Sequence, residues 1–451
     1  MNLRCIIISY FLCGYIQYTK TVNSCSVKIT VWFIHLMLVI ITLIFQMEGS
    51  FRAARAIFII MKVTHEDSVV CRQCTVYESA LLTKILSDSF RDLNISENCF
   101  YGKRIVIKPN LVMKAPSERA ATTHPAVIDA LLTLLGTTGA ADIVIAESPG
   151  GPYTATALRS IYKTCGMEDI AVRHGIRLNF ETGFQNIPAP NAVTSKNFDI
   201  LSPICEADII INVCKLKSHS LTKMSGAVKN FFGTIPGLKK FEMHARFPDY
   251  KDFNSMLVDL CAMLHERMQV INIVDAVIGM EGNGPTGGEP RGIGAVLVSR
   301  NAFCADLLCT EILGFGSGVP MVEEAKRRGF CPEKSSLLTV TGDFHKPLYP
   351  VAFKTPDAQS SFSVFRWLPD LFGGRVYRWL QPKPEIDRSK CVGCGECVRS
   401  CPVHTIDMLM ESGKKRAVIR HDKCIRCYCC QELCPFRAVR IKKNPVFRLI
   451  P

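Results

Sequence analysis

Short runs of apolar and β-branched residues recur between residues 100 and 345, and each run ends abruptly in polar, glycine or proline residues. A stretch with the spacing of an amphipathic helix usually follows. The runs at 104–107, 142–146, 208–213, 270–274 and 295–299 are continuous rather than alternating. Continuous apolar strands that alternate with helices are typical of a sheet buried on both faces. The pattern therefore predicts an α/β domain with a largely parallel sheet and helices on both faces.

Two of the intervening helices have recognisable starts. Thr123 is predicted to cap a helix whose first turn contains Pro125 and whose apolar face lies within 126–135. Asn254 is predicted to cap a second helix over 255–268 in the same way.

Polar side chains follow several of the predicted strands. The carboxyl ends of parallel strands meet at one edge of a sheet, which is where ligands bind. Taken singly, each of these segments is more typical of a turn or of a solvated surface than of a functional site. Because four strand ends bring polar groups to the same edge, we expect a functional cleft there. Its candidate catalytic residues are Lys108, Lys215, Lys217, His219, Asp275 and Glu281.

The segment 215–232 is the richest in polar chemistry. It also contains Lys223, Gly226, Lys229 and Asn230, with Gly233 just beyond it. Several cations beside glycines suit an anionic ligand such as a phosphate or a carboxylate. A metal bound by His219 and His244 is the alternative, but neither has a second His or Cys at ligand spacing. The anion is therefore the favoured ligand.

Several motifs occur in a characteristic order. They are KPN at 108–110, TTHP at 122–125, ESPGG at 147–151, KLKSH at 215–219, GAVKNFFG at 226–233, IPG at 235–237 and MEGNGP at 280–285. This set resembles the DUF362 family, and the resemblance covers residues 61–350. It implies an α/β domain, which in that family is often followed by a pair of iron–sulfur motifs. It implies no particular reaction, because none is established for the family.

A cysteine motif near the C-terminus is repeated with a period of 33 residues, the separation of Cys391 from Cys424. Cys391-x2-Cys394-x2-Cys397-x3-Cys401-Pro402 is matched by Cys424-x2-Cys427-x2-Cys430-x3-Cys434-Pro435. The flanking short strands repeat as well, at 385–390 and 418–423, and at 405–408 and 438–441. Two such halves predict a small α+β domain with pseudo-twofold symmetry, similar to bacterial ferredoxins.

The cysteine spacing predicts two [4Fe-4S] clusters. Three closely spaced thiolates bind one cluster, and the fourth, before proline, reaches across to the other. The predicted ligand sets are Cys391, Cys394, Cys397 and Cys434 for one cluster, and Cys424, Cys427, Cys430 and Cys401 for the other. Zinc, the alternative for paired C-x2-C units, is disfavoured by the duplicated pattern. Cys429 is interpreted as a spectator, with an alternative ligand or a redox-sensitive thiol as the other interpretations.

The remaining segments predict the domain organisation. Residues 1–60 form a hydrophobic extension whose apolar run at 29–45 is just long enough to span a bilayer. A membrane anchor, an extension that packs on the body, and a true start at Met47 or Met61 remain open. The α/β domain is expected at 61–350 and the ferredoxin-like domain at 385–445. Residues 351–384 are expected to be a linker with an apolar packing segment.

Composition and charge limit the classes of function and the cellular locations that the sequence suits. The formal net charge is +14, but no basic run interleaved with aromatic residues occurs, which disfavours nucleic-acid binding. The 22 cysteines are clustered too unevenly for a disulfide framework, so a reducing, cytoplasmic location is expected, with membrane association through 29–45 as a variant.

Three functional hypotheses follow. In the first, the ferredoxin-like module relays electrons to or from an anionic substrate in the α/β domain. In the second, the chain is a non-enzymatic electron carrier or docking protein for a redox partner. In the third, the clusters are structural and the α/β domain catalyses unrelated chemistry.

Overall fold

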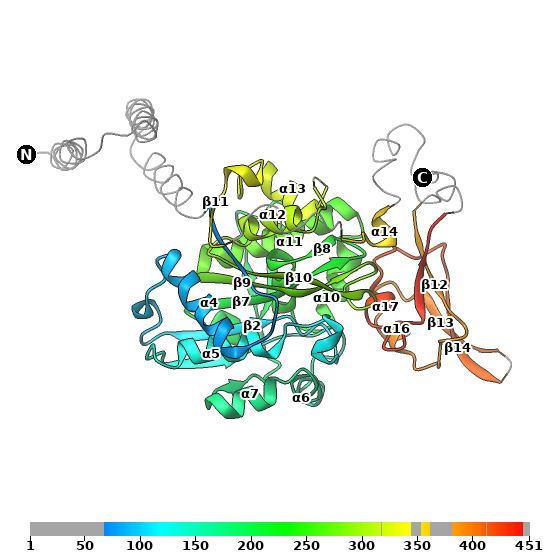
Figure 1. Ribbon diagram of the computed structural model, residues 1–451. Coiled ribbons are helices and arrows are strands. Elements are labelled where there is room, and N and C mark those ends of the chain that lie inside the picture. The colour runs from blue at the N-terminus through cyan, green and yellow to red at the C-terminus, as the bar shows by residue number, and fades with distance from the viewer. Residues whose placement is uncertain (1–66, 317, 344–352, 361–380, 412, 445–451) are drawn as a thin grey trace, which may run out of the picture. The chain divides into compact units, whose positions relative to one another are not determined.

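The computed structural model describes residues 67–316, 318–343, 353–360, 381–411 and 413–444 of the 451-residue chain (Figure 1). The predicted extension 1–60, including the run 29–45 and the alternative starts Met47 and Met61, lies outside these residues. Most of the predicted packing segment at 351–384 lies outside them as well. Within the described ranges, no helix is long and apolar enough to cross a membrane. The described residues belong to one unit, Glu66–Pro451, and the predicted boundaries near 350 and 385 remain predictions.

The first part of the described chain forms a mixed sheet of nine strands in the order β11-β1-β10-β9-β7-β2-β3-β4, with β8 paired to β7. These strands are β1 (Ser68–Gln73), β2 (Arg104–Pro109), β3 (Asp142–Ile145), β4 (Arg177–Leu178), β7 (Ile209–His219), β8 (Lys223–Ser225), β9 (Gln269–Glu281), β10 (Glu289–Ser299) and β11 (Thr339–Thr341). Strands β9, β7, β2, β3 and β4 are parallel neighbours, whereas β10 is antiparallel to β9 and β1. Strands β5 (Phe184–Pro188) and β6 (Asn197–Leu201) pair separately. The predicted α/β class with a mostly parallel sheet is confirmed.

Helices cover both faces of the sheet (Figure 1). One face packs against α4 (Ser79–Asp92), α5 (Pro125–Leu135), α6 (Ala155–Thr164) and α7 (Met167–His174). The other packs against α8 (Ser202–Cys205), α9 (Ala227–Asn230), α11 (Tyr250–Arg267), α12 (Ala302–Ile312) and α13 (Pro320–Arg327). Helix α10 (Lys239–Arg246) follows α9. Because both faces are covered, all eleven residues of β7 are buried, which explains its continuous apolar run.

Both predicted helix caps are wrong. Helix α5 is capped by His124, whose Nδ1 accepts the Ala126 N–H. The Thr123 hydroxyl instead donates to the carbonyl of Val213 on β7 and accepts the Asn110 N–H. Helix α11 begins at Tyr250 and is capped by Asp249, so Asn254 lies within its second turn. In each case, the residue that caps the helix lies within a few positions of the predicted cap in the sequence, and its side chain can also accept a backbone N–H.

Two strands continue beyond their predicted ends, which changes the setting of the candidate residues. Strand β7 extends through Lys215 and Lys217 to His219, and β9 extends through Asp275 to Glu281. A register irregularity between Lys215 and Lys217 interrupts their pairing with β9. These charged residues therefore occupy buried strand positions rather than loops.

The C-terminal module is built from two similar halves. Its elements are β12 (Lys383–Ile386), α16 (Glu396–Arg399), β13 (Ile406–Glu411), β14 (Lys414–Ile419), α17 (Cys429–Glu432) and β15 (Val439–Lys442), with α14 (Asp357–Ser360) before them. Strand β12 pairs with β15, and β13 pairs with β14, all antiparallel. Each half contains a strand, a cysteine loop, a short helix and a strand, as the repeat predicts.

Candidate functional site

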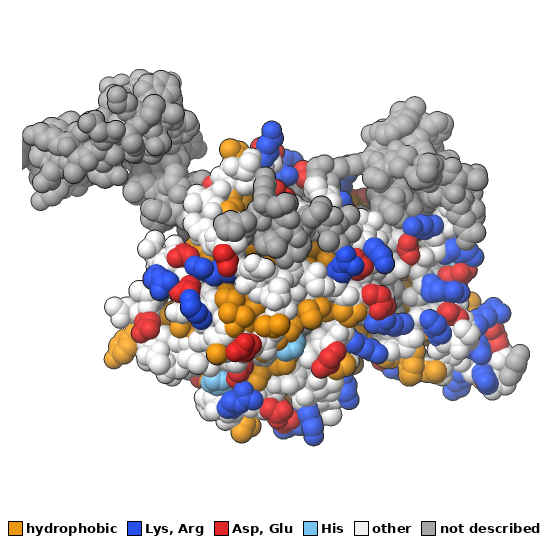
Figure 2. Space-filling view, viewed as in Figure 1, with side chains coloured by type: hydrophobic (Ala, Val, Ile, Leu, Met, Phe, Trp, Pro, Cys, Tyr) orange, Lys and Arg blue, Asp and Glu red, His pale blue; other side chains and the backbone are white. Residues whose placement is uncertain are grey.

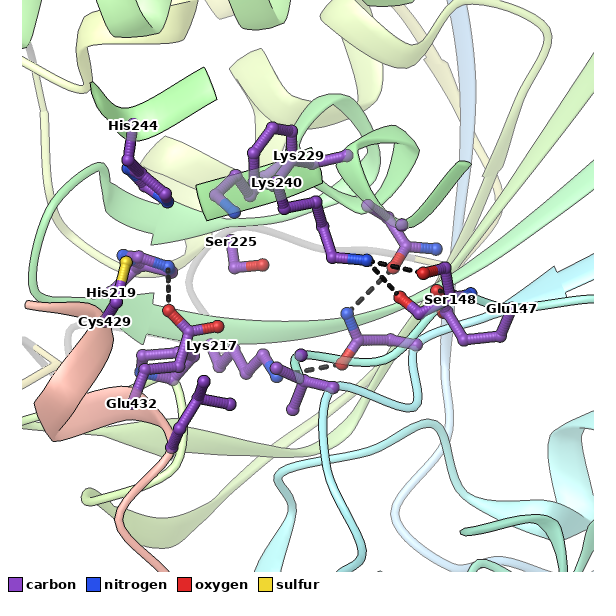
Figure 3. Close-up of a pocket in the computed structure, with 18 of the residues that line it drawn as sticks. Glu147, Ser148, Lys217, His219, Ser225, Lys229, Lys240, His244, Cys429 and Glu432 are labelled. Atoms are coloured by element: carbon purple, nitrogen blue, oxygen red, sulfur yellow. Dashed lines mark hydrogen bonds and ion pairs between the residues drawn. The ribbon is translucent and has the colours of Figure 1, made fainter. Parts of the chain in front are cut away.

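A cavity of about 610 Å³ lies at the carboxyl edge of the central strands (Figure 3). Side chains from β2, β7, β8, α9 and α10, and from the loop after β3, form most of its wall. Helix α17 of the C-terminal module and the loops after β2, α9 and β9 contribute the rest. We call it the lysine cavity, because it is lined by Lys108, Lys217, Lys229 and Lys240.

Lys108 is paired with a carboxylate. Its Nζ lies 2.8 Å from Oε2 of Glu147, and both side chains are buried. Glu147 also accepts backbone N–H groups from Leu111 and Ser148. Burial lowers the pKa of Lys108, and the carboxylate of Glu147 opposes that shift. The pair is therefore balanced in charge and held rigidly by the backbone.

Within the described part of the chain, the hydrogen-bond acceptors of Lys217 and Lys240 are all neutral oxygen atoms. Lys217 Nζ donates to Oδ1 of Asn110 at 2.9 Å and to the carbonyl of Ala121 at 2.5 Å. Lys240 Nζ donates to the carbonyl and hydroxyl of Ser148, at 2.8 and 2.7 Å, and to the carbonyl of Ile235 at 2.9 Å. Burial lowers the pKa of both lysines to about 7. Their positive charge is thus poorly compensated by the protein.

Lys229 is held by an aromatic ring. Its Nζ lies 4.5 Å from the centroid of the Phe232 ring, a cation–π contact. Among the described residues, no hydrogen bond or ion pair to this ammonium group occurs. Burial lowers its pKa. Lys229 is therefore the cavity lysine with most capacity to bind a ligand.

His219 presents a hydrogen-bond donor to the cavity. Its Nδ1 accepts the backbone N–H groups of Leu221 and Thr222, so the ring proton of the neutral side chain is on Nε2. Burial, reinforced by Lys229 and Lys217, lowers the pKa of His219 well below its usual value. Nε2 is buried and has no hydrogen-bond partner among the described residues, and Oε2 of Glu432 is 3.8 Å away. That distance is too long for a hydrogen bond.

His244 has an aromatic environment instead. Its ring stacks on Phe253 with centroids 4.2 Å apart and meets Phe232 edge-on. Burial lowers its pKa to about 3. His219 and His244 both line the lysine cavity. Among the described residues that line the lysine cavity, no group of three or more His, Cys, Asp or Glu side chains is arranged to hold a single metal ion.

Helix α17 of the C-terminal module forms part of the wall of the lysine cavity. Cys429, Glu432 and the following Leu433 line the lysine cavity (Figure 3). The helix is anchored to the α/β domain by hydrogen bonds from Gln431 Nε2 to the Asn283 carbonyl and from the Thr286 hydroxyl to the Glu432 carbonyl. An added Cβ at Gly150 would lie 2.5 Å from the Leu433 side chain, so glycine there permits this close approach.

Two smaller cavities lie within the module, each lined by four cysteines. The first cysteine cavity, of about 340 Å³, is lined by Cys391, Cys394, Cys397 and Cys434. The second, of about 310 Å³, is lined by Cys401, Cys424, Cys427 and Cys430. This grouping has the same three-plus-one composition as the predicted ligand sets. Four thiols around each cavity fit one [4Fe-4S] cluster, whose iron atoms would be bound by these sulfurs.

The cysteine loops repeat in backbone conformation as well as in sequence. Gly393 and Gly395 have positive φ, and so do the equivalent residues Arg426 and Tyr428. Glycine is required at 393, since an added Cβ would lie 2.4 Å from the Lys415 carbonyl oxygen. At the end of each loop a backbone N–H donates to sulfur, from Thr405 to Cys401 and from Ala438 to Cys434. Such N–H groups stabilise negative charge on cluster ligands.

The six candidate residues of the α/β domain fall into two groups. Lys108, Lys217 and His219 line the lysine cavity, whereas Lys215, Asp275 and Glu281 do not. Lys215 Nζ lies 2.5 Å from Oδ2 of Asp275, and both contact the Tyr77 hydroxyl. Glu281 accepts the Lys354 N–H. These three residues have structural partners outside the lysine cavity. The expectation that all six candidates lie in one cleft is therefore corrected to Lys108, Lys217 and His219.

The structure adds residues that the candidate set lacks. Glu147, Ser148, Lys240 and Glu432 line the lysine cavity beside the predicted ones. Glu147 and Ser148 lie just after the carboxyl end of β3, so the rule that placed Lys108 at the sheet edge also applies to them. Lys240 and Glu432 lie on helices far along the chain, and no local sequence signal brings them to this edge.

Family comparisons agree with this organisation. Residues 105–311 match the domain of unknown function DUF362, and residues 390–438 match a 4Fe-4S dicluster domain. The region 105–311 is therefore similar to the DUF362 family, and the chain ends in a 4Fe-4S dicluster domain. It thus carries two [4Fe-4S] clusters, which gives the C-terminal module an electron-transfer role and implies a redox partner.

Individual relatives match one part or the other. A thylakoid-associated protein from Synechocystis is 28% identical over 244 residues, which are 52% of this chain and 71% of that protein. A ferredoxin from Methanothermococcus thermolithotrophicus is 37% identical over 60 residues, 13% of this chain and 95% of the ferredoxin. The lactate racemase apoprotein from Thermoanaerobacterium thermosaccharolyticum aligns with a TM-score of 0.35 and 12% identity, over 54% of this chain. The aligned region spans only 56% of that structure.

Proposed function

We propose that this chain is an iron–sulfur redox protein whose C-terminal module passes electrons to or from a small anion bound in the lysine cavity. The observation that carries the proposal is the position of α17. Cys429 and Glu432 line the lysine cavity, while Cys427 and Cys430 line the second cysteine cavity. Cys427 also packs with Phe241 and Leu433 of the lysine cavity wall. One short helix therefore separates the proposed electron donor from the proposed ligand.

The charges of the cavity support an anionic ligand. Its wall contains four lysines but two carboxylates, Glu147 and Glu432, and Glu147 is committed to Lys108. Buried ammonium groups are costly unless an opposite charge balances them. A carboxylate, sulfate or phosphate group contacting Lys217, Lys229 and Lys240 would supply that charge. The Nε2–H of His219 would donate a further hydrogen bond to it.

The cysteine ligands are part of the same proposal. Cys391, Cys394, Cys397 and Cys434 would bind one cluster, and Cys424, Cys427, Cys430 and Cys401 the other. The composition of the two cysteine cavities supports this assignment. Cys429 lines the lysine cavity instead, which supports its interpretation as a non-ligand.

A reductive titration followed by EPR tests the coupling. The cluster-loaded chain is titrated with and without sulfate, whose binding is measured separately by calorimetry. A bound anion beside a cluster should make its reduction harder, so sulfate should shift one midpoint potential to a more negative value. Lys229→Gln should abolish the shift, whereas Lys163→Gln, an exposed lysine on α6, should preserve it.

Two outcomes would contradict the proposal in different ways. Sulfate that binds without changing either potential would separate the anion site from the clusters. Sulfate that fails to bind would remove the anion site itself, and the module would remain an electron carrier without a site in the α/β domain.

For localisation we propose a reducing compartment and association with a membrane. The relative described as thylakoid-associated supports the second point, and the uneven clustering of the 22 cysteines, which does not suit a disulfide framework, supports the first. Cell fractionation with an antibody to the C-terminal module tests both. Recovery of the protein entirely in the soluble fraction would contradict membrane association.

A further inference from the structure

The two cysteine cavities differ in their exposure to solvent. Val392, Cys394 and Phe436 line the first cavity and are all exposed, Val392 to 59% and Phe436 to 48%. None of the described residues that line the second cavity is exposed. The second cavity lies behind α17, whereas the first presents two apolar side chains and one thiol to the outside. Electron exchange with another protein is therefore favoured at the first cavity.

Basic residues surround this exposed rim. Lys390 precedes Cys391, and Arg416 donates to the Cys391 carbonyl at 3.1 Å. Lys415 lies against the loop at Gly393, and Arg399 lies beside Gly395. Two carboxylates oppose these cations: Glu396, which lines the cavity and is paired with Arg399 at 2.7 Å, and Asp387, which interacts electrostatically with Lys390. The rim therefore has an excess of positive charge.

The basic excess extends over the whole module. Between Lys383 and Lys443 the sequence has 14 Lys and Arg residues against 7 Asp and Glu residues. Two clusters with four thiolates each would contribute about two negative charges apiece, which leaves the module positive. Lys and Arg side chains are numerous on the part of the surface that this module occupies (Figure 2). Compensation of cluster charge therefore does not account for all of them.

We propose that an acidic one-electron carrier protein docks on the rim of the first cysteine cavity, with Val392 and Phe436 at the centre of the contact. Apolar residues at the centre and complementary charges at the edge are typical of transient interfaces. A membrane would also attract a basic surface, but lipid headgroups exchange no electrons with a cluster, and the exposed apolar pair lies directly over a cluster cavity. An acidic flavoprotein or iron–sulfur protein satisfies both features.

Stopped-flow reduction tests the proposal. The oxidised, cluster-loaded chain is mixed with a reduced acidic flavodoxin, and bleaching of the cluster absorbance is followed. The variant Lys390→Glu/Lys415→Glu should slow the reaction on the order of tenfold at low salt, because steering is lost. High salt should bring it and the wild type to similar rates. Both lysines are exposed and make no ion pair among the described residues, so the fold should be unaffected.

A matched control separates docking from net charge. Lys103→Glu/Lys163→Glu makes the same change in charge on exposed sites of the α/β domain and should leave the rate nearly unchanged. Methyl viologen radical, a small reductant, should reduce all three proteins equally. Equal slowing in both double variants, or in neither, would overturn the proposal. The proposal would also be overturned if the chain bound phosphatidylglycerol vesicles in a salt-dependent way that requires Lys390 and Lys415, while the rate of reduction by flavodoxin did not depend on these two lysines.

This inference needs the electron-transfer role of the module but not the lysine cavity. If sulfate did not change the midpoint potentials, the docking proposal would still hold. If the rate of reduction by flavodoxin did not depend on the rim lysines, the proposed anion site would still hold. The two failures are therefore distinguishable.

Discussion

Lysines with the same chemistry are stabilised in different ways within one cavity. Lys108 has the carboxylate of Glu147, whereas Lys217 and Lys240 have neutral oxygen atoms. Burying an ammonium group is unfavourable unless a negative charge accompanies it. Removing the carboxylate of Glu147 should therefore destabilise the fold around Lys108. A bound anion should stabilise the charged forms of Lys217 and Lys240.

Glu147→Gln tests the paired lysine. It is expected to reduce the free energy of unfolding by roughly 3–5 kcal/mol, because Lys108 would remain buried without a counter-charge. Urea denaturation provides the measurement. Asp88→Asn is the matched control, since Asp88 contacts Lys84 and Arg91 on an exposed helix surface and should matter little. Equal losses in the two variants would show that Lys108 does not depend on its partner.

The unpaired lysines predict how anion binding depends on pH. Sulfate remains a dianion between about pH 6 and about pH 9, while Lys217 and Lys240, with pKa values lowered to about 7, lose their charge. Each lost charge should weaken binding on the order of tenfold, about 1.4 kcal/mol. Calorimetry across this range should show affinity falling as pH rises. A constant affinity would mean that these lysines do not contact the anion.

The free energy of unfolding of the ligand-free protein should rise with pH, whereas its affinity for sulfate should fall. An unfolded lysine keeps its proton up to about pH 10.4, whereas folded Lys240 loses it near pH 7. The unfolded state therefore binds more protons between these values, and stability contributed by this lysine rises with pH in that window. Urea midpoints at about pH 7 and about pH 9 should show a smaller rise for Lys240→Met than for the wild type. If the urea midpoint of Lys240→Met rose as much as that of the wild type, the pH dependence of stability would come from other groups.

Residue chemistry alone could not separate the cavity lysines from the others. Lys215 and Lys217 lie two positions apart on β7, and nothing local distinguishes them. The difference comes from Tyr77, whose hydroxyl lies between Lys215 and Asp275 although it is 138 residues from Lys215. Such a partner is specified by tertiary packing and not by spacing along the chain.

At the scale of elements, the short helix α9 positions Lys229 and is held by one buried carboxylate. The backbone N–H groups of Ala227 and Val228 donate to the two oxygens of Asp306, at 2.6 and 3.1 Å. Gly226 precedes the helix and lies against the same carboxylate. The position of Lys229 therefore depends on a contact outside the cavity.

Gly226→Ala tests this dependence. An added Cβ would lie 2.2 Å from Oδ1 of Asp306, so the carboxylate or the helix must move. We expect a loss of stability of roughly 1–3 kcal/mol, with weaker sulfate binding as Lys229 is displaced. Gly292→Ala, where no atom lies within 4 Å of the added Cβ, should change neither quantity appreciably. Thermal unfolding and calorimetry measure the two effects, and identical behaviour of the two variants would contradict the expectation.

Elements were predictable where chemistry fixes the spacing. The cysteine repeat predicted both halves of the module, because cluster binding constrains loop length on each side. Helix starts were less predictable, since His124 and Asp249 cap where Thr123 and Asn254 were expected. Strand ends were missed for β7 and β9 because a buried lysine and a buried aspartate satisfy each other inside the sheet. Charged residues normally signal the end of a strand, and here they do not.

Across the described chain, separate hydrophobic cores support the α/β domain and the cluster module. The two large apolar clusters draw on residues 69–353, whereas the apolar cluster of the module draws on Cys397 to Val439. Smaller clusters join the parts, one of them made by Phe241, Cys429 and Leu433. Loss of the clusters should therefore disrupt the module while leaving the sheet intact, and the wall formed by α17 should open.

Removal of the clusters tests this separation. His219 and His244 are 4% and 6% exposed, partly because α17 covers the lysine cavity. After chelation under oxidising conditions, modification of both by diethylpyrocarbonate should speed up by at least on the order of tenfold, because metal loss unfolds metal-dependent modules. Mass spectrometry of modified peptides gives the rates. His174, on α7 and outside the cavity, should react at the same rate in both forms. Unchanged protection of His219 would mean that α17 keeps its place without the clusters, and faster modification of His174 as well would mean that the α/β domain depends on them.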